Sequence, residues 1–336
     1  MYSLTLRSLI ITCASTHVFA AIIGNYTVVT SHLFAKSGLQ IPRIGFGTAG
    51  LGLSTQEAVQ FALDVGYDMV DTAQAQEWYS EESVSKGIGH SRKRLEDVFI
   101  VTKVHPRSFA FSRLEKDLER SHSLLSIENE LLDLVLIHAP FCWPGHCTEA
   151  EKRHNWQECW RNLEFLKSDG RFVGHLGVSN FDVTLMEALL SYSNTQVAAV
   201  QNWCDPFHQD LEVREIAKEH GIVYMGYSSF GTQWSHKLGY NPVLESHVLL
   251  DIATKHQVST TQVVLSWLLQ EEVVSIPRST SIPHIRENLF LKQRKPVAGG
   301  EDHRDAQGVY EYECFLDHDD LRRIHALDGS LGVPWE

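Results

Sequence analysis

Eight short apolar runs, each followed by a loop and an amphipathic stretch, dominate this chain from residue 33 onward. The runs occupy residues 44–49, 68–73, 98–103, 132–138, 172–180, 196–203, 221–229 and 273–279. Between them lie helical patterns such as LEVREIAKEHG, which ends in His220 and Gly221 as helices commonly do. Continuous apolar strands that alternate with helices indicate a parallel sheet covered by helices. Eight such units predict an α/β fold, the (β/α)8 TIM barrel.

The remaining segments are expected to decorate one barrel domain that spans residues 28–336. A chain of 336 residues is within the usual range for a single α/β barrel. Residues 28–38 are predicted to form a β-hairpin beneath the barrel. Residues 295–313 interrupt the alternation of strands and helices and are predicted to form an inserted loop. We expect long loops at the carboxyl ends of the strands.

The charge balance excludes one class of partner. The formal net charge is −13, and no run of basic residues stands out. Because neutralising phosphates requires clustered Lys and Arg, we expect neither a nucleic-acid surface nor an anionic-membrane surface.

Residues 1–27 differ in character from the barrel. Arg7 precedes the apolar run SLIITCASTHVFAA, in which Val18 and Ala20 suit a signal-peptidase site. This run is short for a membrane span, and Asn25 begins a glycosylation acceptor, NYT. We expect a leader that targets the secretory pathway or an organelle. The alternative is a disordered extension on a cytoplasmic protein, and an uncleaved leader would be the one membrane contact expected.

The cysteines form no obvious framework. Five remain if the leader leaves with Cys13, and an odd number is a poor basis for paired disulfides. Cys142 and Cys147 could close a small disulfide loop in an oxidising compartment. With His146 and His154 they could instead suggest zinc, but a second spaced pair is lacking. Between zinc and ordinary reduced loop thiols we favour the thiols, and we predict no metal.

Polar side chains end the predicted strands one after another. In chain order they are Asp71, Lys103, His138, Ser179 with Asn180, Gln201, Tyr227, and Arg278 with Ser279. Barrel enzymes place their chemistry at these strand ends. A Schiff-base aldolase could use the lysine, whereas a metal hydrolase would want more ligands than these ends supply. Two amides, an aromatic ring and an arginine before a helix start suit a nicotinamide dinucleotide better.

Ordered motifs make the sequence similar to the aldo-keto reductase superfamily over residues 33–327. They are GFGTAGL (45–51), GYDMVDTA (66–73), VFIVTKVHP (98–106), LDLVLIHAP (132–140), GHLGVSNF (174–181), VQNWCDP (200–206), MGYSSFG (225–231), SIPRST (275–280) and IRENL (285–289). The resemblance implies a carbonyl reductase whose catalytic residues are Asp71, Tyr79, Lys103 and His138. In that scheme the tyrosine protonates the carbonyl oxygen, and the lysine, held by the aspartate, lowers the tyrosine pKa. The histidine orients the substrate.

The resemblance also implies a set of cofactor-binding residues. These are Ser179, Asn180 and Gln201 at the carboxamide, Tyr227 against the nicotinamide ring, Thr48 near the ribose, Arg278, Ser279 and His284 at the phosphate, and Glu287 and Asn288 at the adenosine. The arginine favours NADPH over NADH, because a guanidinium can hold the extra phosphate. We expect a monomer that acts on a small carbonyl compound. The alternative, which the family also includes, is an NADPH-binding regulatory or scaffold subunit with little turnover.

The position of the tyrosine departs from the family pattern. The family usually has it five residues after the aspartate, where this chain has Gln76. Tyr67 precedes the strand and would lie at the wrong end of the barrel. We expect a small insertion that moves the tyrosine to Tyr79, with Ser80 as the N-cap of the next helix.

The substrate pocket departs from the pattern as well. Ala49 replaces an aromatic residue of the first motif, and the residues after Gln201 differ too. The aromatic residues expected to line the pocket are Phe141, Trp143, Trp234 and Trp335.

Overall fold

Eight parallel strands form one continuous sheet in the computed structural model, which describes residues 10–11, 20–23, 26–30, 32–127, 130–289 and 311–332. In sheet order they are β6 (Phe46–Gly47), β7 (Met69–Asp71), β8 (Phe99–Val104), β9 (Leu132–Ile137), β10 (Val173–Ser179), β11 (Ala199–Trp203), β12 (Val223–Tyr227) and β13 (Val274–Ser275). Seven fall inside their predicted apolar runs, and β8 extends one residue beyond its run, to Val104. The chain order equals the spatial order, so the prediction of the strands is confirmed.

The first and last strands meet and close the sheet into a barrel. Ser275 N–H donates to the Arg43 carbonyl at 2.9 Å, and Gly45 N–H donates to the Ser275 carbonyl at 2.9 Å. Gly47 N–H donates to the Pro277 carbonyl at 3.0 Å. A Cβ atom at Gly47 would lie 2.7 Å from the Ile276 carbonyl oxygen, so only glycine allows this approach. The glycine of the first motif is therefore a requirement of barrel closure.

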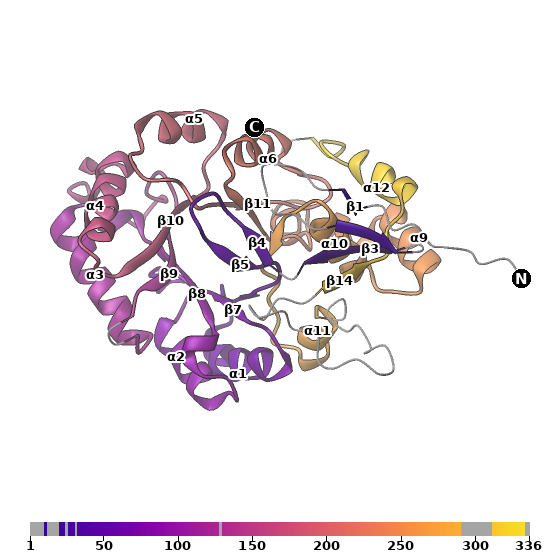
Figure 1. Cartoon of the computed structure of the whole chain (residues 1–336), viewed down its shortest axis with the longest axis horizontal. Coiled ribbons are helices and arrows are strands. Elements are labelled where there is room, and N and C mark those ends of the chain that lie inside the picture. The colour runs from indigo at the N-terminus through magenta and orange to yellow at the C-terminus, as the bar shows by residue number, and fades with distance from the viewer. Residues whose placement is uncertain are drawn as a thin grey trace, which may run out of the picture.

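Helices cover the outside of the barrel, as Figure 1 shows for α1 to α4 around β7 to β10. The helices are α1 (Thr55–Val65), α2 (Glu81–His90), α3 (Phe111–Leu124), α4 (Trp156–Ser168), α5 (Val183–Tyr192), α6 (Leu211–His220), α7 (Thr232–Leu238), α8 (Pro242–Glu245), α9 (His247–His256), α10 (Thr260–Gln270), α11 (Ile282–Glu287) and α12 (His318–His325). Short 3-10 turns are η1 (Gly52–Ser54), η2 (Leu95–Asp97), η3 (Pro106–Ser108) and η4 (Glu151–Arg153). The predicted glycine cap is confirmed, because Gly221 follows α6 with a φ of 65°.

Two apolar clusters make up the core. The larger one lies between the strands and the helices, and the smaller one fills the barrel interior with residues such as Met69, Val101 and Leu134. Leu39 and Ile41 of the N-terminal hairpin join the inner cluster. The barrel is thus a packed core, and any open cavity must lie at its ends.

The N-terminal hairpin is present but lies later than predicted. Strand β4 (His32–Phe34) pairs antiparallel with β5 (Gln40–Pro42), so the hairpin spans residues 32–42 instead of 28–38. Lys36 N–H donates to the Gly221 carbonyl at 2.8 Å, just before β12 begins, which places the hairpin beneath the barrel as expected. The turn needs Gly38, whose φ is 87°.

A separate four-stranded sheet contains β1 (Ile10–Ile11), β2 (Ala20–Ile23), β3 (Tyr26–Thr30) and β14 (Glu311–Cys314). Strand β14 pairs antiparallel with β3 and both pack near α10 (Figure 1). The prediction of an inserted loop is therefore wrong at residues 311–313, and 295–310 lie outside the described residues. The leader remains a prediction, since only its segments 10–11, 20–23 and 26–27 are described. Among the helices that the structure describes, none is long and apolar enough to cross a membrane.

Candidate active site

The polar residues that end the strands point into the barrel because of where they fall in the strand register. Side chains alternate between the two faces of a strand, so the residue two positions after an inward apolar residue also points inward. The inner cluster contains Met69, Val101, Leu136, Ala199 and Met225. Two residues after each come Asp71, Lys103, His138, Gln201 and Tyr227. Five polar side chains therefore converge at the carboxyl end of the barrel.

A cavity of about 750 Å³ opens at this end. Nine residues predicted from the sequence line it: Asp71, Tyr79, His138, Ser179, Asn180, Gln201, Tyr227, Arg278 and Ser279. Two more predicted residues, Lys103 and Thr48, are buried behind Asp71 and hydrogen-bond to it. The structure thus brings together eleven of the fourteen predicted site residues.

Lys103 and Asp71 form a buried ion pair at the base of the cavity. Lys103 Nζ donates to Asp71 Oδ1 at 2.6 Å, with side chains 1% and 3% exposed. Gln201 Nε2 donates to the second carboxylate oxygen at 2.8 Å, and Thr48 Oγ1 donates to the Asp71 carbonyl at 2.8 Å. Burial lowers the pKa of Lys103, and the Asp71 carboxylate opposes that shift. Both oxygens of the aspartate are satisfied, so the pair is fixed in position.

A compact turn brings Tyr79 into the cavity. The amides of Trp78 and Tyr79 both donate to the Ala75 carbonyl, at 3.0 and 2.9 Å, and Gly50 N–H donates to the Trp78 carbonyl at 2.7 Å. Gln76, at the position expected from the family pattern, is exposed and does not line the cavity. The predicted N-cap is confirmed, because Ser80 Oγ accepts from Ser83 N–H at 3.2 Å at the start of α2. The three extra residues form this turn.

The Tyr79 ring lies beside both expected partners. Its centroid is 5.7 Å from that of His138, edge-on at 70°, and Lys103 Nζ is 5.2 Å from it. Burial and the Asp71 carboxylate raise the phenol pKa above its usual value, which the Arg278 guanidinium only partly opposes. The expected lowering of this pKa by the lysine is therefore wrong here. The reason is that burial disfavours the charged phenolate, and the negative charge of Asp71 adds to the shift.

His138 is held as a neutral imidazole. Burial, followed by the charges of Lys103 and His105, lowers its pKa well below the usual value. Its Nδ1 atom is buried and has no hydrogen-bond partner within the part of the chain that the structure describes. Asn180 Nδ2 donates to the His138 carbonyl at 2.7 Å, and the Tyr227 hydroxyl donates to Asn180 Oδ1 at 2.6 Å. Asn180 takes a left-handed backbone, with φ at 61°, which asparagine tolerates better than most residues.

The predicted phosphate and adenosine residues divide into two groups. Arg278 lies at the rim, where one guanidinium nitrogen donates to the Ala49 carbonyl at 2.6 Å, and Ser279 Oγ accepts from Ser281 N–H at 3.0 Å. His284, Glu287 and Asn288 do not line the cavity. The histidine is exposed, and Asn288 is 4% exposed and interacts with Tyr67 beneath α11. Tyr67 itself is fully buried away from the cavity, as expected.

The aromatic lining differs from expectation at two positions. Trp143 does line the cavity, but Phe141 points away and is 68% exposed. Trp234 is 1% exposed and packs against Trp203 and Phe207, so it belongs to the core. Trp335 lies outside the described residues. Lining residues not predicted from the sequence include Trp78, Ser228, Ser229, Phe230, Thr232, Asn241 and Leu244, of which all but Trp78 lie between β12 and α9. The signal available in the sequence was the length of this connection.

Cys142 and Cys147 form a disulfide, with Cα atoms 6.0 Å apart. Of the alternatives left open by the sequence, the disulfide loop is the one that forms, in place of the reduced thiols favoured over zinc, and the bonded sulfurs are not available as zinc ligands. The reason is that five residues of separation and a turn at Gly145 bring the two Cα atoms within bonding reach. Cys159, Cys204 and Cys314 are free and buried.

Comparison with known proteins shows the family of this chain. The sequence profile of the aldo/keto reductase family matches residues 43–295. A 9,11-endoperoxide prostaglandin H2 reductase from Trypanosoma cruzi (strain CL Brener) is 33% identical over 79% of this chain and 86% of its own length. A glyoxal reductase from Bacillus subtilis (strain 168) is 33% identical over 76% of this chain and 84% of its own. The crystal structure of an aldo/keto reductase from Brucella melitensis superposes with a TM-score of 0.70 at 27% identity, covering 88% of this chain and 99% of that one. The chain belongs to the aldo/keto reductase family, oxidoreductases that act on carbonyl groups with nicotinamide cofactors.

Proposed function

We propose that this protein is an NADPH-dependent carbonyl reductase in which Tyr79 protonates the carbonyl oxygen. One observation carries the proposal: Asp71, Tyr79 and His138 line the same cavity, and the Lys103 ammonium that pairs with Asp71 lies 5.2 Å from the centroid of the Tyr79 ring. An ion pair that only stabilised the fold would not need a phenol and a neutral imidazole on the side that faces the cavity. A proton donor and a hydrogen-bonding partner for a carbonyl oxygen do need that arrangement.

The cavity suits a nicotinamide dinucleotide. Ser179, Asn180 and Gln201 line it beside the Tyr227 ring, and Arg278 lines it at the rim. Amide and hydroxyl groups beside an aromatic ring suit a nicotinamide, and a guanidinium suits a phosphate. Tyr227, Asn180 and Ser179 would hold the nicotinamide end, and Arg278 the phosphate end. When bound, the nicotinamide supplies a hydride to the carbonyl carbon.

The protein groups would then act on the oxygen. The neutral imidazole of His138 donates a hydrogen bond to the carbonyl oxygen and orients it. Tyr79 gives up its proton as negative charge develops there, and the ammonium of Lys103 offsets the charge left on the phenolate. Asp71 keeps the lysine in place. The raised phenol pKa keeps Tyr79 protonated before the reaction, as a proton donor must be.

The direct test is oxidation of NADPH, followed by absorbance, with a panel of aromatic and aliphatic aldehydes. Turnover of any of them supports the proposal. Binding of NADPH without turnover across the panel would instead favour a regulatory or scaffold subunit.

The preference for NADPH is expected to depend on Arg278. Replacing it with alanine removes the guanidinium from the rim of the cavity, where it would pair with the 2′-phosphate. The Arg278→Ala variant is expected to bind NADPH roughly 10- to 100-fold more weakly, as for the loss of a charged hydrogen bond, with little change for NADH. Titration calorimetry with both cofactors measures this. Arg286→Ala is the matched control, because that exposed guanidinium lies over the Phe61 ring and outside the cavity. Equal weakening for both cofactors would contradict the assignment.

We also propose that residues 1–27 target the protein to an oxidising compartment. The Cys142–Cys147 disulfide supports this, because such bonds persist in secreted and lumenal proteins and are rare in the cytosol. N-terminal sequencing of the native protein tests it, and an intact Met1 on a cytoplasmic protein would contradict it.

A further inference from the structure

The disulfide closes a small ring next to the cavity. Cys142 follows His138 by four residues, and the bond to Cys147 encloses Trp143, Gly145 and His146. Within the ring, His146 N–H donates to the Trp143 carbonyl at 3.1 Å, and Gly145 adopts a φ of 81°. The Trp143 backbone is therefore constrained from both sides, which limits the directions that its side chain can take.

Trp143 packs edge-on against four other rings, the most distant being that of His146, whose centroid lies 6.3 Å away. The Trp143 centroid lies 4.9 Å from that of His138, 5.1 Å from that of His105 and 5.1 Å from that of Trp78, with interplanar angles between 75° and 89°. Edge-to-face arrangements at these distances are favourable. The indole is half-buried and lines the cavity, so part of it faces the space beside His138 and Tyr79.

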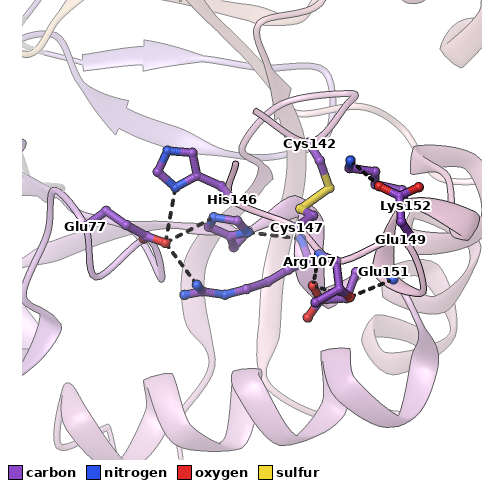
Figure 2. Close-up of a disulfide and its surroundings, with 10 residues drawn as sticks. Glu77, Arg107, Cys142, His146, Cys147, Glu149, Glu151 and Lys152 are labelled. Carbon is purple, nitrogen blue, oxygen red and sulfur yellow. Dashed lines mark hydrogen bonds and ion pairs between the residues drawn. A yellow bond between two sulfur atoms is a disulfide. The ribbon is translucent and has the colours of Figure 1, made fainter. Parts of the chain in front are cut away.

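A polar contact of Glu77 ties the same ring to the loop that carries Tyr79. Figure 2 shows dashed lines from Glu77 to His146 and to Arg107, beside the loop that the Cys142–Cys147 bond closes. The Glu77 carboxylate is 3.5 Å from His146 Nδ1 and 3.0 Å from an Arg107 nitrogen. Burial alone would raise the Glu77 pKa, but its backbone amide, Arg107 and the neighbouring histidines together lower it, which keeps the carboxylate charged. Glu77 directly precedes Trp78 and Tyr79, so the residue that contacts the disulfide ring lies in the same loop as the proton donor.

The two indoles lie apart from the proposed cofactor residues. Trp78 and Trp143 come from the loops after β7 and β9, whereas the cofactor residues come from β10 to β13 and the segment after β13. Of the lining residues in the described part of the chain, only Asp71 and Arg278 are permanently charged. The first is paired with Lys103 and the second lies at the phosphate end. An anionic substrate would therefore have no cationic partner beside the indoles, whereas the aromatic ring of a substrate could contact the edges of both indoles.

We propose that Trp143, held by the Cys142–Cys147 disulfide, is a specificity-determining residue that selects uncharged aromatic aldehydes. This inference rests on the proposed reductase function. The indole contacts the aromatic ring of the substrate while its carbonyl oxygen meets Tyr79 and His138. The disulfide acts on selectivity by fixing the indole and takes no part in the reaction.

The test compares 4-nitrobenzaldehyde with methylglyoxal as substrates for the full-length enzyme. Trp143→Ala is expected to lower kcat/KM for the aromatic aldehyde about tenfold more than for methylglyoxal, mainly through KM, as for the loss of an aromatic contact. Trp143→Phe is expected to restore most of the preference. The double variant Cys142→Ser/Cys147→Ser, which keeps the indole but opens the ring, is expected to reduce the preference as well. Calorimetry should show unchanged NADPH affinity in all three.

Three outcomes separate the possible failures. Equal loss for both substrates in Trp143→Ala, or no loss for either, overturns the role of the indole. An unchanged preference in the double serine variant overturns the role of the disulfide. A wild-type enzyme that binds NADPH but reduces neither aldehyde overturns the proposed function and, with it, this inference.

Discussion

Replacing Tyr79 with phenylalanine is expected to lower kcat by roughly 10²- to 10⁴-fold, the usual contribution of a positioned general acid. The variant keeps the ring that contacts His138 and removes only the hydroxyl. The Lys103–Asp71 pair below it keeps all its hydrogen bonds, so the architecture of the cavity is preserved. The loss should fall on kcat, because the proton is needed in the transition state more than in substrate binding.

NADPH oxidation with a reactive aldehyde measures this loss, and calorimetry checks that cofactor binding is retained. Gln76→Leu is the matched control, because Gln76 holds the position at which the family pattern would place the tyrosine. Its side chain is exposed and outside the cavity, so the change should leave kcat nearly unaltered. Full activity in Tyr79→Phe, or a large loss in Gln76→Leu, would mean that the proton donor lies elsewhere.

The strands and their polar ends could be predicted because both follow from local sequence. A run of apolar residues must be buried on both faces, and eight such runs allow few architectures. Once the barrel is assumed, every strand end lies at the same rim, so Asp71, Lys103 and His138 had to converge. Asn288 was assigned to the adenosine site by the resemblance alone, and the strand pattern does not specify which way it faces, because a helix residue near the rim can face either the cavity or the core. Its burial against Tyr67 depends on how α11 packs, which no local pattern specifies.

The edges of the fold were harder to predict than its centre. Strand β14 forms only because β3, nearly three hundred residues earlier, supplies its hydrogen bonds. The alternating sequence YEYEC is a strand signal, but a single edge strand has no partner that the sequence identifies. The hairpin was placed four residues early for a related reason. Its register is set by the turn at Gly38 and by the contact with Gly221, and the second of these is tertiary.

The aromatic residues that line the cavity are a third feature that the sequence does not specify. Four aromatic residues had equal claims from sequence, yet only Trp143 of those described lines the cavity. Phe141 lies just before the disulfide ring and is turned to solvent, while Trp234 is drawn into the core by Trp203 and Phe207. A disulfide bond depends on the distance between two Cα atoms, which sequence spacing permits but does not determine.

Replacing Lys103 with methionine is expected to destabilise the fold by about 3–5 kcal/mol, the usual cost of breaking a buried ion pair from one side. Methionine has a similar length and fills the space, so little of the loss should come from a cavity. The cost arises because Asp71 would remain buried with Gln201 as its side-chain donor and no opposing charge. A second substitution, Asp71→Asn, removes that charge and should restore much of the stability, because neutral groups replace both ions.

Urea unfolding of the two variants, followed by fluorescence, measures these differences. Lys86→Met is the matched control, since it breaks an ion pair with Glu82 whose side chains are 54% and 61% exposed. Exposed pairs within a helix contribute little, so its effect should stay within about 0.5 kcal/mol. Equal, small losses for Lys103→Met and Lys86→Met would show that the buried pair is not held as tightly as its hydrogen bonds indicate. A double variant no more stable than Lys103→Met would show that the lysine side chain stabilises the barrel through packing instead of charge.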